Sequence, residues 1–175
     1  GNFIMNRKWI HFILISVVVV ILTGCGKTVE EQITEGFAST ATVFEAKPVE
    51  PTTTIGKIKV YLPSGYKVEE GTNEMNYIFT KGKDSFILFV NTIEAEDSRL
   101  HYDILVNDSK LNIIKEQTFE FEDAFGFAAV IEHSEEQYEL VVSSGGVKMT
   151  TMAADKNIDE KLVNMMEIVR SVKVQ

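Results

Sequence analysis

The stretch FAAVIEHSEEQYELVVSSGGVKMTTMAA, residues 127–154, decides the fold, because it divides into three strand-like segments joined by two short turns. Residues 127–133, 138–143 and 147–154 read as strands, and Ser134-Glu135-Glu136 and Ser144-Gly145-Gly146 separate them. Connections this short join antiparallel neighbours. The stretch therefore predicts a three-stranded antiparallel meander.

A fourth strand precedes this meander. Residues 113–122 alternate, with Phe119 and Phe121 on one face and Glu120 and Glu122 on the other. That pattern is typical of a strand with one solvent-exposed face. Residues 123–126, Asp-Ala-Phe-Gly, are expected to turn the chain into the meander.

Three more strands are expected nearer the amino terminus. Residues 58–62 alternate apolar and more polar side chains, and the segment Pro63-Ser64-Gly65 that follows predicts a turn. Residues 76–80 and 86–92 form a predicted hairpin across the turn 81–84. The run Phe86-Ile87-Leu88-Phe89-Val90 is apolar on both sides, so we expect this strand to be central.

The clearest helix prediction lies near the carboxyl terminus. One apolar stripe repeats at helical spacing, formed by Ile158, Leu162, Met165, Met166 and Val169. Asn157 followed by Glu160 is a capping-box pattern that predicts where this helix begins. Residues 171–174 alternate again and are expected to form a short last strand or to lie along the sheet.

A second helix is expected over residues 97–111. Four apolar side chains fall on one helical side: Leu100, Ile104, Leu105 and Leu111. Asp97 or Ser98 is expected to cap its start. The element order of strands, helix, strands and helix predicts an α+β fold, an antiparallel β-sheet of about six to seven strands covered by two helices.

Residues 55–174 also carry motifs that resemble the PsbP-like family. These are the opening VYLPSGY at 60–66, the helix near 97–111, GFAA at 126–129 and IVRSV at 168–172. The resemblance implies an α/β/α sandwich. It also implies a small extracytoplasmic or lumenal accessory domain that binds partner proteins, and it supplies no catalytic residues.

The amino-terminal residues have the zones of a secretory signal. Arg7 and Lys8 are basic, residues 9–22 are almost all apolar, and Thr23 and Gly24 are small. As a helix, residues 9–22 would measure about 21 Å, which is short against a bilayer core of about 30 Å.

Cys25 is the only cysteine, so no disulfide can form within the chain. Leu22-Thr23-Gly24-Cys25 resembles the signal end of a bacterial lipoprotein precursor. The resemblance implies cleavage after residue 24, a diacylglyceryl group on the Cys25 thiol, and fatty acyl chains such as palmitate at the new amino terminus. Two or more chains hold a protein stably on a membrane. An ordinary cleaved signal and an uncleaved anchor helix are the alternatives.

Residues 26–54 are polar and bear Pro48 and Pro51, a composition that predicts a flexible tether. Its r.m.s. reach would be roughly 30 Å and its extended limit about 95 Å. Whether residues 36–45, with Phe37 and Phe44, dock on the domain is left open. The expected organisation is a signal peptide at 1–24, the lipidated Cys25 and tether at 25–54, and a globular domain at 55–175.

The charge balance is acidic. The chain has a formal charge of −9, and from Cys25 onward it carries 15 basic and 26 acidic side chains, a charge of −11. Nucleic acid would repel this surface, so we expect no nucleic-acid partner. An anionic membrane would repel it too, so lipid must supply the attachment, with the domain standing off the bilayer.

No catalytic residues, cofactor or metal site are expected from the titratable side chains. His133, with Glu132, Glu135 and Glu136, is expected to be a solvated turn, the alternative being a loose surface metal site. His101 is expected on the polar face of its helix. Most of the other carboxylates alternate with apolar residues as the wet side of strands: Glu120, Glu122, Asp123 and Glu139.

The remaining motifs also favour structural roles. Ser143, Ser144, Gly145 and Gly146 predict a hairpin turn rather than a nucleophile or phosphate loop. Four methionines are expected to fill the core, the alternative being an adaptable ligand groove: Met149, Met152, Met165 and Met166.

Three functions are compatible with these observations. The first is a membrane-anchored extracytoplasmic lipoprotein that presents a non-catalytic binding domain to an envelope protein. The second is a small-ligand or metal carrier whose pocket is lined by Tyr61, Tyr66, Tyr77 and Phe79. The third is a hydrolase whose site is assembled from distant residues.

Overall fold

The structure, a computed structural model, describes residues 26–69 and 73–175. Cys25 and the predicted signal peptide therefore lie outside the described residues. In the described part, the chain has an α+β fold with two antiparallel sheets. The large sheet has seven strands in the order β3 (Tyr66–Glu69), β4 (Asn76–Lys81), β5 (Asp84–Val90), β9 (Val147–Ala153), β8 (Gln137–Ser144), β7 (Ala124–Ser134) and β6 (Ile113–Phe121).

The small sheet has three strands in the order β1 (Thr53–Ile55), β2 (Ile58–Val60) and β10 (Lys173–Val174). Of the two outcomes expected for residues 171–174, the short last strand is observed, but it comprises only residues 173–174, since Ser171 ends α4. The prediction of an antiparallel α+β fold with about seven strands is confirmed for the large sheet. The sequence patterns did not predict β1, β3 or a second sheet.

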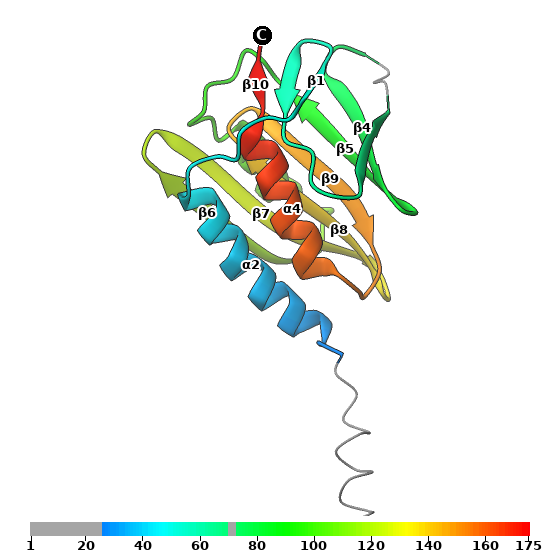
Figure 1. Ribbon diagram of the computed structural model, residues 1–175. Helices are drawn as coiled ribbons and strands as arrows, with labels where there is room; N and C mark the ends of the chain where they lie inside the picture. The colour runs from blue at the N-terminus through cyan, green and yellow to red at the C-terminus, as the bar shows by residue number, and fades with distance from the viewer. Residues whose placement is uncertain (1–25, 70–72) are drawn as a thin grey trace, which may run out of the picture.

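The helices lie on both faces of the large sheet. Helices α2 (Val29–Glu45) and α4 (Ile158–Ser171) lie side by side on one face (Figure 1). Helix α3 (Leu100–Asn107) packs on the other face, where its Tyr102 ring lies 5.8 Å from the Phe125 ring and 5.5 Å from the Phe127 ring. No helix within residues 26–69 and 73–175 combines the length and the apolar character of a membrane span.

The tether prediction is wrong for most of its length. Residues 29–45 form α2, and Phe37 and Phe44 are buried in the main core, so residues 36–45 dock on the domain. Two residues without side chains allow the close approach. A Cβ on Gly36 would lie 2.9 Å from the Asp159 Cα in α4, and a Cβ on Gly126 would lie 2.5 Å from the Phe44 ring. The folded unit therefore begins near residue 28 rather than residue 55.

Two local features of the sequence favour helix α2: a capping box at its start and an apolar stripe along one side. The Thr28 hydroxyl accepts a hydrogen bond from the Glu31 backbone N–H, and the Glu31 carboxylate accepts one from the Thr28 N–H, which completes a capping box. Ile33, Phe37 and Phe44 then fall on one side of the helix at spacings of four and seven residues. That side packs against α4 and strands β6 and β7.

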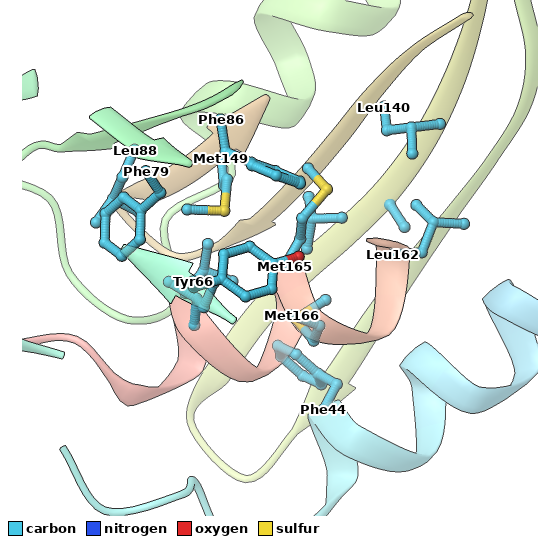
Figure 2. Close-up of a cluster of buried hydrophobic side chains, with 14 of the residues drawn as sticks. Phe44, Tyr66, Phe79, Phe86, Leu88, Leu140, Met149, Leu162, Met165 and Met166 are labelled. Atoms are coloured by element: carbon cyan, nitrogen blue, oxygen red, sulfur yellow. The ribbon is translucent and has the colours of Figure 1, made fainter. Parts of the chain in front are cut away.

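The main core lies between the large sheet and the α2–α4 layer. Figure 2 shows Tyr66, Phe79, Phe86 and Met149 gathered with Met165 and Met166 of α4. The predicted core role is confirmed for Met149, Met165 and Met166. It is wrong for Met152, which alternation along β9 places on the opposite face of the sheet and which is 45 % exposed.

Three predicted details of the secondary structure are wrong. Strand β5 is an interior strand of the sheet, third from one edge, but its apolar run is not buried on both faces. Ile87 is 50 % exposed because the sheet face on which it lies is only partly covered. Helix α3 is shorter than predicted, since it begins at Leu100 and ends at Asn107, and its buried side carries His101 and Leu105 rather than Leu100 or Ile104.

The third detail is the predicted capping box at the start of α4. Asn157 adopts a left-handed conformation with φ of 58° and makes no side-chain cap. Its role is taken by Gln32 of α2, whose Oε1 accepts a hydrogen bond of 2.9 Å from the Ile158 N–H. A contact between segments distant in sequence therefore replaces the local one.

Candidate functional site

The predicted lipidation site, Cys25, lies outside the described residues, and the residues that follow it are held firmly. Lys27 Nζ lies 2.5 Å from Glu35 Oε2 in α2 and 2.9 Å from Asp159 Oδ2 in α4. The hydrogen bonds to Glu35 and Asp159 raise the pKa of Lys27. Burial alone would raise the pKa of Asp159, but the hydrogen bond from Lys27 helps to hold it below its usual value. Lys27 and Asp159 are therefore charged at neutral pH.

His101 and His133, the two histidines among the described residues, lie apart and differ in environment. His133 is exposed, and its Nε2 lies 2.8 Å from Glu139 Oε2. Glu135 and Glu136 are exposed in the adjoining turn, as predicted. Among residues 26–69 and 73–175, no group of three potential metal-ligating side chains is close enough to hold an ion.

The prediction that His101 lies on the polar face of its helix is wrong. Its side chain is buried against the Phe89 ring, at 5.7 Å between centroids, and its Nε2 hydrogen bonds with the Gly146 carbonyl at 3.1 Å. Burial lowers the pKa of His101 and opposes the effect of the bond to Gly146. The side chain therefore ties α3 to the β8–β9 turn.

That turn is the one predicted at residues 144–146. Gly145 has φ of +55°, a conformation that favours glycine. The Ser143 hydroxyl donates to the Val147 carbonyl at 2.9 Å, so it is engaged by the backbone of the same hairpin. The carboxylates that were expected to face solvent are exposed or half-buried. The exposed ones are Glu120, Glu122, Asp123, Glu135 and Glu136, and the half-buried ones are Glu132 and Glu139.

Three of the four aromatic side chains of the carrier hypothesis are buried in the core, and the fourth, Tyr61, is half-buried. Tyr66 and Tyr77 are each 5 % exposed, and Phe79 is fully buried. Figure 2 shows Tyr66 and Phe79 packed among core side chains. These rings stabilise the interface between sheet and helices, and they are not available to a ligand.

A cleft that the sequence did not predict lies at the carboxyl-terminal end of α4. It measures about 250 Å³, and its walls include Glu94, Glu96, Ser144 and Arg170. The Arg170 guanidinium lies 4.5 Å from the centroid of the Phe44 ring. Burial lowers the pKa of Arg170, and the nearby Glu96 and Glu122 carboxylates oppose that effect. The Arg170 side chain therefore helps to hold the carboxyl end of α2 against the domain.

The other unpredicted feature is an apolar surface on the sheet face opposite α2 and α4. Ile78, Ile87 and Thr150 are direct cross-strand neighbours on β4, β5 and β9, and Met152 follows Thr150 by two residues on the same face. Ile104 of α3 borders the same surface and is 61 % exposed. We call Ile78, Ile87, Ile104 and Met152 the open-face patch.

The open-face patch includes polar residues between its apolar side chains, and other polar residues border it. Two shallow depressions, one beside α3 and one beside the β4–β5 turn, share Glu139 and Thr150 in their walls. Lys148 borders the first depression, and Lys83 and Asp84 border the second. The sequence signal for this patch was the two-sided apolar run at residues 86–90, which was interpreted as a buried central strand.

Comparisons with solved structures find chains of similar arrangement. No family model matches the chain, and no curated protein matches its sequence. The solution structure of cyanobacterial PsbP (CyanoP) from Synechocystis sp. PCC 6803 aligns at a TM-score of 0.40 and 9% sequence identity. The alignment covers 70% of this chain and 95% of that chain. This similarity is loose, so the fold class rests on the topology described above.

Proposed function

We propose that this chain is a lipoprotein anchored through lipid on Cys25 at the extracytoplasmic face of a membrane. Its folded domain is a non-catalytic binding module for an envelope protein. The anchor is supported by the three zones of residues 7–24 and by Cys25 itself, the only thiol in the chain.

The side chains that could perform acid–base or nucleophilic chemistry are engaged or solvated. His101 is hydrogen bonded to a backbone carbonyl, His133 is exposed beside Glu139, and the Ser143 hydroxyl donates to the backbone. A general acid or base would instead need a pKa matched to its task in a water-poor site. These environments favour a binding role.

The observation that carries the binding role is the open-face patch. Ile87, Ile104 and Met152 are 50 %, 61 % and 45 % exposed; Ile87 and Met152 line one depression, and Ile104 lines the neighbouring one. Exposed apolar side chains grouped on one sheet face, with polar residues among and around them, are typical of a protein–protein interface, where the centre loses water and the border stays wet. A protein partner fits the flat sheet surface better than a small molecule, which favours a concave site.

Photo-crosslinking in the native cell tests this proposal. A photoreactive amino acid replaces Ile87, and a matched chain carries it at Thr34, an exposed residue of α2 on the opposite side of the sheet. We expect one discrete protein adduct from position 87 in the membrane fraction and none from position 34.

A second substitution shows whether the adduct depends on the patch. Met152→Glu places a charge on the same surface at a half-exposed position, so the fold is expected to be kept and the adduct lost. Equal crosslinking from positions 87 and 34, or an adduct that persists with Met152→Glu, would contradict the binding role of the open-face patch.

A further inference from the structure

The first described residues are fixed to the domain rather than free. Lys27 is joined to both long helices, through Glu35 of α2 and Asp159 of α4. The next residue, Thr28, is the amino-terminal cap of α2. Only Gly26 separates Lys27 from Cys25.

Gln32 reinforces this junction from within. Its Nε2 donates to the Lys27 carbonyl at 3.2 Å and to the Asp155 carbonyl at 2.7 Å, and its Oε1 accepts from the Ile158 N–H. The side chain is buried, being 5 % exposed. One amide group therefore joins the incoming chain, the β9–α4 connection and the first turn of α4.

We infer that the lipid on Cys25 holds the domain directly against the membrane in one orientation, with the amino-terminal ends of α2 and α4 toward the lipid headgroups. This inference rests on the proposed lipid anchor. Two residues, from Cys25 to Lys27, span about 7 Å when fully extended. A chain that short, attached to a fixed residue, restricts both the distance and the tilt of the domain.

The two ends of the domain are well separated. Helix α2 is about 25 Å long. Its middle passes Asp159 of α4 at Gly36, and its carboxyl end reaches Gly126 of β7 through Phe44. Strand β7, with 11 residues, spans about 36 Å between the β6–β7 turn and the β7–β8 turn. Asp123 lies in the first of these turns, and Lys156 lies in the β9–α4 connection at the opposite end.

The end that carries Lys27 is acidic on balance. Its depression is lined by Lys27, Lys156, Asp155 and Asp159, and the first turns of α2 and α4 add Glu30, Glu31 and Glu160. An anionic leaflet does not attract such a surface, so the lipid and the short link to Lys27 must hold the domain in place.

Fluorescence quenching in lipid nanodiscs tests the orientation. The lipidated full chain is purified from membranes with one introduced cysteine, Lys156→Cys or Asp123→Cys, both at exposed positions. The lipid occupies the Cys25 thiol, so the introduced thiol is the only one that reacts with a fluorophore. The nanodiscs contain a lipid with a nitroxide quencher on its headgroup.

We expect quenching several-fold stronger at position 156 than at position 123. A matched chain carries twelve Gly/Ser residues inserted between Gly26 and Lys27, an r.m.s. reach of about 20 Å, and leaves every contact of the domain in place. The difference between the two positions is expected to shrink in that chain.

Equal quenching at the two positions without the insertion would overturn the orientation. Mass spectrometry of the same sample separates this result from failure of the anchor. Lipid on Cys25 together with equal quenching overturns the orientation alone, whereas an unmodified Cys25 thiol overturns both the orientation and the proposed anchor.

Discussion

Replacing Phe44 with alanine tests whether α2 is part of the folded domain. Phe44 is fully buried at the carboxyl end of α2, and its ring centroid lies 5.6 Å from that of Phe119 and 4.5 Å from the Arg170 guanidinium. Removing a buried phenylalanine side chain costs about 3–5 kcal/mol of unfolding free energy. Total stabilities are about 5–15 kcal/mol, so the loss is a large fraction of the whole.

Urea titration of residues 26–175, followed by circular dichroism, measures this change. We expect the midpoint to fall by about 1–2 M urea and Tm to fall by roughly 6–20 °C. Thr34→Ala is the matched control, since Thr34 lies on the exposed side of the same helix and its replacement should change stability by no more than about 0.5 kcal/mol.

The alternative is the flexible tether that the composition of residues 26–54 predicts. In a tether, Phe44 would have no buried environment to lose. A cost below about 1 kcal/mol for Phe44→Ala, similar to that of Thr34→Ala, would show that α2 is not packed as described.

Three further substitutions test the junctions of the domain. Gln32→Ala leaves the buried Ile158 N–H without its acceptor, and we expect a loss of about 1–3 kcal/mol in urea unfolding. Gly126→Ala places a Cβ 2.5 Å from the Phe44 ring and 2.6 Å from the Ser143 carbonyl oxygen, with an expected cost of about 1–3 kcal/mol that Phe44→Ala should relieve in part. Burial lowers the pKa of His101 below 6.5, so the unfolded chain takes up a proton that the native protein resists, and stability falls as pH drops below that value. Titrations above and below pH 6.5 should show a weaker pH dependence for His101→Gln, and an unchanged dependence would contradict this role.

The sequence predicts the hairpins and α4 because their signals are local. Short turns such as Gly145-Gly146 lie between strands whose apolar residues alternate, and the α4 stripe from Ile158 to Val169 follows one helical face. These patterns need no knowledge of distant residues. They therefore give the order of elements and the antiparallel sheet.

Helix α2 was missed although its signals were present. Thr28 and Glu31 form a capping box, and Ile33, Phe37 and Phe44 form a stripe, but the threonines and nearby prolines suggested a flexible segment. Residues such as Gly36 and Thr40 weaken the stripe in the sequence, and yet both are buried because α4 packs closely against them. The local capping box and apolar stripe, reinforced by packing against α4, therefore outweighed the polar composition.

The open-face patch could not be predicted because local periodicity does not show which sheet face a helix covers. Ile87 is apolar in a strand that is apolar on both sides, which is equally typical of a buried strand. Helix α3 packs over β7 and β8 and reaches β5 only at Phe89, which leaves Ile87 and Met152 exposed to solvent. The cap of α4 by Gln32 could not be predicted from local patterns either, because Gln32 and Ile158 are 126 residues apart.

The central claim is that this domain is attached to a membrane through Cys25. Mass spectrometry of the native protein extracted from its membrane tests it most directly, by reading the amino-terminal peptide. The account predicts that the chain begins at Cys25 and carries a diacylglyceryl group with further acyl chains. A free thiol at Cys25, or a chain that retains residues 9–22, would contradict it.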